Sequence, residues 1–302
     1  MSAGNDELNG MTMVCASCGI AEVDEIKLME CDGCDLVRYC SDDCQNNHRS
    51  EHDEACKERA AELHDEWLYK QPESSYLGDC PICTIPLSLH LHKSSMYSCC
   101  SKLVCDGCDY VNKMREDKMR LRQSCPFCRE PVPSTIEERD KQRMKRIEAN
   151  DPVALCGEGM VQYSKGEYIK AFEYYTKAAD LGDAESHFRL SCMYHKGDGV
   201  EEDIMKFTWH QLVAAIHGHA VARYNLGLQQ ESAGNIESAV KHWIIAASQG
   251  EDDAIKALMD AFKHGQVKKE DLAAALRAHK VAVDATKSPQ RKAAEQSSRA
   301  TL

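Results

Sequence analysis

The chain has 302 residues, of which 43% are hydrophobic but only 6% aromatic, so it is long enough for two or three domains with mainly aliphatic cores. It contains no apolar run of the roughly eighteen residues needed for a membrane span, and it begins without the features of a secretory signal. These properties predict a cytoplasmic and/or nuclear protein with no membrane partner. The formal net charge of −12 argues against nucleic-acid partners and favours protein partners.

The cysteines are concentrated in the first part of the chain. Of seventeen in total, fifteen lie between residues 15 and 128, most of them in Cys-x2-Cys pairs. Thiols stay reduced in the cytosol and nucleus, and two cysteines on one tight turn can reach the same tetrahedral zinc ion. The pattern therefore predicts zinc as the cofactor, about four ions, rather than disulfides. Because zinc-bound thiols are deprotonated, such sites would lower the formal charge to about −19.

Residues 1–12 are predicted to be disordered, and residues 13–58 contain eight candidate ligands in four pairs, enough for two zinc ions. Their spacing, with Tyr39 before the fifth ligand and Gln45 after the sixth, resembles the MYND-type zinc finger. This resemblance implies binding of short proline-containing peptides, at a surface where Arg49 stands in place of a tryptophan that the family often has. It also implies two interleaved ligand sets, which are Cys15, Cys18, Cys40 and Cys44 for one ion and Cys31, Cys34, His52 and Cys56 for the other.

A linking helix and linker are predicted for residues 59–78, and the next eight cysteines fall within residues 79–131. Their order resembles a RING-type finger, except that Lys102 occupies the position of a histidine ligand and is protonated at neutral pH. Eight cysteines suffice for two tetrahedral zinc ions if the adjacent Cys99 and Cys100 both bind, which a turn at this point would allow. The resemblance then implies the sets Cys80, Cys83, Cys105 and Cys108, and Cys99, Cys100, Cys125 and Cys128.

The alternative for the second of these sites is that only one of the adjacent cysteines binds zinc and that His90 or His92 completes the set. In either arrangement a RING finger has no catalytic residue of its own, because it holds a ubiquitin-conjugating enzyme in a reactive pose. Three residues beside the ligands match the partner-binding surface of that family, namely Ile82, Pro126 and Arg129. The resemblance therefore implies RING-type ubiquitin-ligase activity.

Beyond these modules the sequence is helical and periodic. A Ser-x2-Glu capping box predicts a linking helix over residues 132–149. Residues 150–280 contain three similar segments, each with an Ala pair before a helix-stopping glycine, and the glycines, spaced by 36 and 32 residues, are Gly182, Gly218 and Gly250. This period predicts a stacked α-solenoid, and the "GDGVEED" turn resembles Sel-1-like repeats, relatives of tetratricopeptide repeats that bind proteins. Trp209 is expected in the repeat core, and residues 281–302 are expected to form a mostly disordered tail.

The predicted fold is mainly α, with two small zinc-stabilised α+β or irregular modules followed by an α-solenoid of helix-pair repeats. The predicted function is that of a zinc-binding protein-interaction adaptor, in which the RING-like finger recruits a conjugating enzyme while the repeats bind a client protein. The alternative is a non-catalytic scaffold in which both fingers are structural or protein-binding modules.

Overall fold

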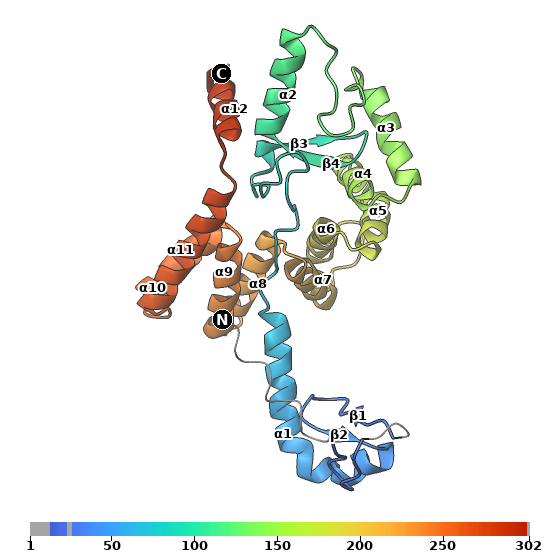
Figure 1. The fold of residues 1–302 in the computed structure, drawn as a ribbon, viewed down its shortest axis with the longest axis vertical. Helices are drawn as coiled ribbons and strands as arrows, with labels where there is room; N and C mark the ends of the chain where they lie inside the picture. The colour runs from blue at the N-terminus through green and yellow to red at the C-terminus, as the bar shows by residue number, and fades with distance from the viewer. Residues whose placement is uncertain (1–12, 23–25, 301–302) are drawn as a thin grey trace. The chain divides into compact units, whose positions relative to one another are not determined.

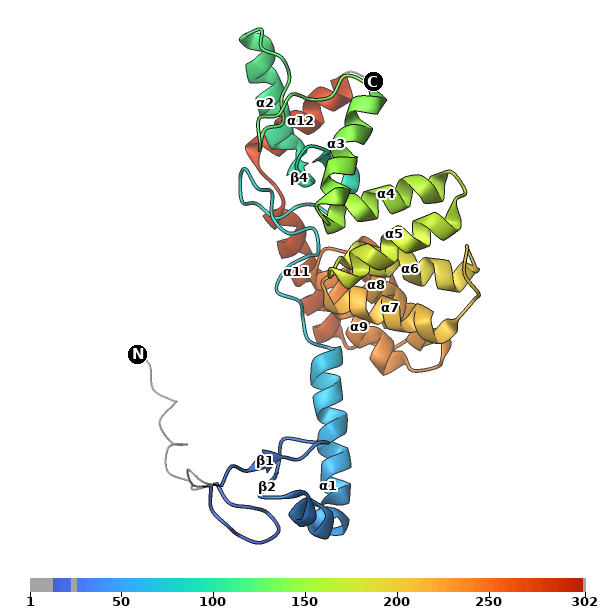
Figure 2. The same cartoon turned by 90° about the vertical axis from the view of Figure 1, so that its right-hand side faces the viewer.

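The computed structural model describes residues 13–22 and 26–300, so the predicted disorder of residues 1–12 lies outside the described part of the chain. Within that part helices dominate, and the named strands form two short antiparallel ribbons (Figures 1 and 2). The chain divides into two compact units, residues 1–70 and 71–302. The predicted fold class, a helical solenoid preceded by small cysteine-rich modules, is confirmed. No described helix is both long and apolar enough to cross a membrane.

The first unit contains the first cysteine module (residues 13–58), which is built on β1 (Met29–Glu30), β2 (Arg38–Tyr39) and the long helix α1 (Asp42–Leu68). Ser41 caps this helix, and its side-chain oxygen accepts a hydrogen bond from a backbone N–H of the first turn at 3.3 Å. The helix therefore begins well before the predicted linking helix, because its cap precedes the last three candidate ligands and all three lie on it.

The second unit begins with a linker that packs on the repeats. The Tyr76 ring stacks on the His219 ring with 4.3 Å between centroids, and its backbone N–H donates to the Gly218 carbonyl at 3.1 Å. Gly218 leaves no room for a larger residue, since an added Cβ would lie 2.4 Å from the Ser74 carbonyl oxygen. Close backbone approach therefore holds this linker in place.

The second cysteine module (residues 79–131) follows the linker. Its regular elements are the single turn η1 (Leu91–Lys93), β3 (Ser94–Tyr97), β4 (Lys102–Cys105) and α2 (Asp106–Lys118). The two strands form a hairpin, and a small core consists of Cys80, Leu87, Val104 and Cys105. So few apolar side chains cannot stabilise a module of this length without cross-links or metal ions.

The solenoid begins after α3 (Ile136–Glu148), which is the predicted linking helix. Successive helices pair most closely as α4 with α5, α6 with α7 and α8 with α9, and short turns join the pairs (Figure 2). Aspartates cap three of these helices, as is usual at helix N-termini. The helices are α4 (Pro152–Ser164), α5 (Tyr168–Asp180), α6 (Ala184–Lys196), α7 (Ile204–Ile216), α8 (Ala220–Ser232), α9 (Ile236–Ser248), α10 (Asp252–Lys263) and α11 (Lys269–Ala285).

The predicted helix stops and small-residue contacts are present in the solenoid. Gly182, Gly218 and Gly250 all have positive φ and follow α5, α7 and α9 directly after their caps. The Ala pairs at 178–179, 214–215 and 246–247 are buried. Each repeat therefore brings its helices close to their neighbours through alanine at these positions.

A second small-residue position, which sequence reasoning missed, sets the distance between the helices of two of the pairs, α4 with α5 and α8 with α9. A Cβ added at Gly159 of α4 would lie 2.5 Å from the Tyr175 ring of α5, and one added at Gly227 of α8 would lie 2.3 Å from the Trp243 indole of α9. The glycine stands sixteen residues before the aromatic residue in both pairs. This repeated spacing of sixteen residues can be read from the sequence. In both pairs the aromatic ring fills the space that a side chain at the glycine would occupy.

Acid is expected to weaken the solenoid through His242. Burial and the charge of Arg223 lower the pKa of His242 from 6.5 to about 4. Unfolded His242 takes up a proton below pH 6.5, whereas the folded form stays neutral to about pH 4, so its contribution to stability is present above pH 6.5 and is lost as the pH falls to about 4. Between about pH 7 and 4.5, His242→Gln should lose about 2 kcal/mol less unfolding free energy than the unmodified chain. Denaturant unfolding followed by circular dichroism at both pH values checks this, and equal losses in the two proteins would contradict it.

The end of the chain differs from the expected disordered tail. After three residues beyond α11, helix α12 (Pro289–Ala300) forms and packs against α2. The side-chain oxygen of Ser288 accepts the Arg291 N–H at 3.2 Å, and proline occupies the first helical position, which is a favoured start for a helix. Ala294 is buried. A low-hydrophobicity segment is therefore ordered by its cap and by the surface on which it lies.

Candidate metal centres and partner groove

In the first cysteine module the predicted ligand sets come together as two groups, each with its four donor atoms within 4.8 Å of one another. One group joins a loop turn with residues that follow β2 and begin α1, and the other joins the loop between β1 and β2 with the middle of α1. The sulfur atoms of Cys18 and Cys40 lie 3.5 Å apart, and the Cys34 sulfur lies 3.1 Å from His52 Nε2. Each of the two interleaved groups therefore joins a loop of the module to α1.

His48 lies one turn before His52 but belongs to neither group. Its Nδ1 is 3.1 Å from the hydroxyl of the buried Tyr39, and its ring stacks on the His52 ring with 5.8 Å between centroids. The His48 ring therefore packs against the imidazole of His52, and the Tyr39 hydroxyl holds His48 in this position. Arg49, the residue in place of the family's tryptophan, is exposed.

In the second cysteine module the donors also form two groups of four, and both adjacent cysteines belong to the second group. A turn over residues 98–101 makes this geometry accessible, with Ser101 at positive φ and its N–H bonded to the Tyr97 carbonyl at 2.8 Å. The Cys99 sulfur lies 3.4 Å from that of Cys128, and the Cys100 sulfur lies 3.8 Å from that of Cys125.

The alternative ligands of this site lie elsewhere. His90 approaches Asp252 of α10, with 3.7 Å between Nε2 and the carboxylate, and its ring contacts the His92 ring. Lys102, at the expected histidine position, is exposed at the start of β4. Neither histidine is among the donors that surround Cys125 and Cys128.

The donor sets fit tetrahedral zinc. All seventeen cysteines are free thiols, and the sulfur separations of 3.4 to 3.8 Å within the groups are far longer than the roughly 2.0 Å of a disulfide. Zinc–sulfur bonds of about 2.3 Å in a tetrahedron give sulfur separations of about 3.8 Å. Sulfur and imidazole donors favour zinc over calcium or magnesium. Four protein donors leave no open position, which is the arrangement of a structural rather than a catalytic site.

Hydrogen bonds between neighbouring cysteines give the thiols within a donor group different pKa values. The hydrogen bond with Cys105 lowers the pKa of Cys80 to about 4, and the same contact raises the pKa of Cys105. In the first module, hydrogen bonds with Cys18 and Cys44 raise the pKa of Cys40 to about 12. A metal ion that binds such a set displaces the protons that these contacts hold, so metal affinity falls as the solution becomes more acidic.

Three Cys-x2-Cys turns share one backbone design. The residue four positions after the first cysteine has positive φ, and its N–H donates to the carbonyl of that cysteine at 2.9 Å. In the first module glycine occupies this left-handed position, but in the second module it is held by Thr84 and Arg129, for which the conformation is strained. The Cys125-x2-Cys128 turn therefore fixes the backbone of Arg129.

The three predicted partner-binding residues line one groove of about 340 Å³. Ile82 is 43% exposed, Pro126 is buried and Arg129 is exposed. The Arg129 guanidinium donates to the side-chain oxygen of Asn112 at 3.0 Å, which holds it against α2. Other lining residues include Val111, Arg115, Ser288 and Gln290, and the last two come from the segment that begins α12. Sequence reasoning missed the contribution of Ser288 and Gln290, because nothing local to residues 288–290 indicates contact with the module.

Comparison with known families agrees with two of the three modules. Residues 15–56 match the MYND finger, and residues 155–183, 184–206 and 216–251 match the Sel1 repeat. The predicted MYND finger and Sel-1-like repeats are thereby confirmed. Residues 57–154, which include the second cysteine module, lie outside both matches.

Individual relatives share only parts of the chain. A Helicobacter pylori (strain J99) protein named "Putative beta-lactamase HcpC" is 36% identical over 56 residues, which are 18% of this chain and 19% of the relative. A Sel1 repeat protein from Oxalobacter formigenes is 28% identical with a TM-score of 0.44, covering 51% of this chain and 66% of that one. The Escherichia coli antigen c5321, displaying an SLR fold, is 20% identical with a TM-score of 0.39, covering 64% and 40%.

Proposed function

We propose that the protein is a zinc-stabilised interaction adaptor with RING-type ubiquitin-ligase activity. The second cysteine module recruits a ubiquitin-conjugating enzyme, and the repeats bind a client protein. The adaptor part of this proposal is supported by the MYND finger and the Sel1 repeats, which are typically protein-interaction modules. A reducing compartment, the cytoplasm or nucleus, suits a chain whose function depends on free thiols.

Four structural zinc ions are part of the proposal. Each of the four donor groups supplies a complete tetrahedral set, and the zinc ions would cross-link loops that have little apolar core of their own. In this role the metal takes no part in a reaction. It fixes the Cys-x2-Cys turns, and these turns position the residues of the groove.

The observation that carries the ligase proposal is the convergence of Ile82, Pro126 and Arg129 in one groove. Ile82 offers an exposed apolar contact on one zinc turn, and Pro126 comes from the other turn. Arg129 is held by its strained backbone and by Asn112, so its charge is oriented before a partner binds. A RING finger acts by holding its partner rather than by bond-making chemistry, so a preorganised surface of this kind suits the proposal.

The repeats carry exposed apolar side chains that suit client binding. Met205 and Trp209 lie one turn apart on α7 and are 78% and 56% exposed, so Trp209 is not the core residue that the sequence predicts. Tryptophan is enriched among the residues that dominate protein interfaces.

Autoubiquitination with a panel of conjugating enzymes tests the ligase activity. Ile82→Ala is expected to lower the rate of chain formation about tenfold or more, because it removes an exposed apolar contact of the groove. Ile136→Ala is the control, since Ile136 is 63% exposed on α3 and lies outside the groove. If the unmodified protein, with four zinc ions bound, forms no chains with any conjugating enzyme, the ligase proposal is wrong and the non-catalytic scaffold is favoured.

A further inference from the structure

We infer that helix α12 is part of the second cysteine module and that Arg291 is an outer-sphere hydrogen-bond donor to the zinc-binding thiolate of Cys83. The two residues are separated by the whole solenoid in sequence, yet they meet in the folded chain. This inference rests on the zinc occupancy proposed for the group of Cys80, Cys83, Cys105 and Cys108, and it does not depend on ubiquitin transfer.

The contacts of Arg291 are concentrated on one zinc turn. Its Nη2 lies 3.7 Å from the Cys83 sulfur and donates to the Ile85 carbonyl at 3.0 Å. Its Nη1 donates to the Pro86 carbonyl at 2.6 Å and to the Thr286 carbonyl at 2.7 Å. The Arg291 guanidinium thus joins the start of α12 to the Cys83 sulfur and to the backbone that follows Cys83.

The start of α12 is seated closely enough to hold this geometry. Gly107 of α2 lies between the candidate ligands Cys105 and Cys108, and a Cβ added there would lie 2.6 Å from the Arg291 backbone nitrogen. Only glycine therefore allows α12 to approach here. Farther along α12, Lys93 of η1 forms an ion pair with Glu295 at 2.9 Å. The backbone of Arg291 is therefore held in place where its side chain contacts the turn that follows Cys83.

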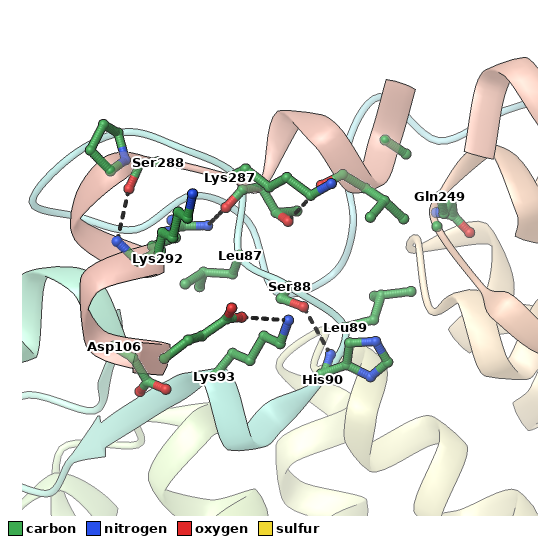
Figure 3. Close-up of a pocket in the computed structure, with 17 residues that line it drawn as sticks. Leu87, Ser88, Leu89, His90, Lys93, Asp106, Gln249, Lys287, Ser288 and Lys292 are labelled. Atoms are coloured by element: carbon green, nitrogen blue, oxygen red, sulfur yellow. Dashed lines mark hydrogen bonds and ion pairs between the residues drawn. The ribbon is translucent and has the colours of Figure 1, made fainter. Parts of the chain in front are cut away.

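Beside this contact a cavity lies between the module and the solenoid. A cavity of about 800 Å³ lies between residues 87–93, the Gln249–Gly250 turn and the segment from α11 to α12 (Figure 3). Its walls carry both signs of charge, among them Lys292 and Asp106. Arg291 is among the residues that line this cavity, so its guanidinium lies where the cavity meets the turn that follows Cys83.

Charge makes arginine suited to this position. A zinc ion with four thiolates carries a net charge of −2, and a guanidinium that donates to one of them stabilises the negative sulfur. Lysine has no planar fork with which to reach the sulfur and three carbonyls together. Outer-shell partners of metal ligands commonly affect metal affinity about 10- to 100-fold. We therefore expect the loss of Arg291 to loosen one zinc ion selectively.

Zinc release from the full-length protein into a chromogenic chelator tests the inference. In Arg291→Ala one of the four zinc ions should leave about tenfold faster, and Arg291→Lys should restore only part of the difference. Lys292→Ala is the matched control, because it removes the same charge from the next residue, whose side chain is exposed. Hydrogen exchange should show faster exchange of the backbone amides of residues 83–85 in Arg291→Ala alone.

The two possible failures are distinguishable. If the unmodified protein holds no zinc at the Cys80 group, the proposed occupancy is wrong. If it holds that zinc but Arg291→Ala and Lys292→Ala release it at the same rate as the unmodified protein, the outer-sphere role of Arg291 is wrong.

Discussion

Replacing Cys99 with serine is expected to lower the zinc content of the protein from about four ions to three. The Cys99 sulfur lies 3.4 Å from that of Cys128 in the second donor group of the module. A serine hydroxyl is a poor zinc ligand, so three thiolates would remain and the tetrahedral set would be incomplete. Structural zinc ions contribute much of the folding free energy of small modules, and the β3–β4 turn and the residue 125–129 turn should therefore lose order. Native mass spectrometry counts the ions, and hydrogen exchange reports the order of the two turns.

Cys192→Ser provides the control for this prediction. Cys192 lies on α6, is partly buried and belongs to none of the four donor groups, so its replacement should leave the zinc count unchanged. Full zinc occupancy in Cys99→Ser would show that a histidine completes the site instead. His90 and His92 would then have to leave their present positions beside Asp252 and beside each other.

Gly159→Ala should destabilise the solenoid by about 1–3 kcal/mol, the usual cost of overpacking. The added Cβ would lie 2.5 Å from the Tyr175 ring, and Tyr175 is fully buried, so the ring has no free space to enter. Either the ring must leave its place or α4 and α5 must separate. Urea unfolding followed by circular dichroism measures the difference in the free energy of unfolding.

Gly157→Ala is the matched control in the same helix. A Cβ at Gly157 meets nothing within 4 Å, and the backbone there is helical, so alanine should be neutral or stabilise the helix by about 0.5–1 kcal/mol. Equal stability of the two variants would contradict the view that the missing side chain of Gly159 sets the spacing of the helix pair.

The parts of the structure that the sequence predicted well depend on local spacing. Cysteine pairs on tight turns, a capping box and a glycine at a fixed period each determine geometry within a few residues. Ligand counting was informative at Cys99 and Cys100, because the sequence predicted a turn at this point and the structure contains one. The α-solenoid was predicted from the spacing of Gly182, Gly218 and Gly250, a pattern that is visible only when several helices are compared.

The parts that the sequence did not predict depend on contacts between distant segments. The composition of residues 289–300 suggested disorder, but a cap and the surface of α2 order them as α12. Nothing in the sequence around Arg291 indicates that its guanidinium donates to the carbonyls of Ile85 and Pro86, some 205 residues earlier in the chain. Trp209 was expected in the core because tryptophan usually packs, and exposure on α7 cannot be distinguished from burial by residue type alone.

The most direct test of the account is the number of zinc ions bound to the unmodified full-length chain. Native mass spectrometry should find four, one for each complete donor group, and each should be lost together with the uptake of protons as the solution is acidified. A count of two would contradict the account, because it would mean that the second cysteine module is not a metal site and that its groove is not built by zinc.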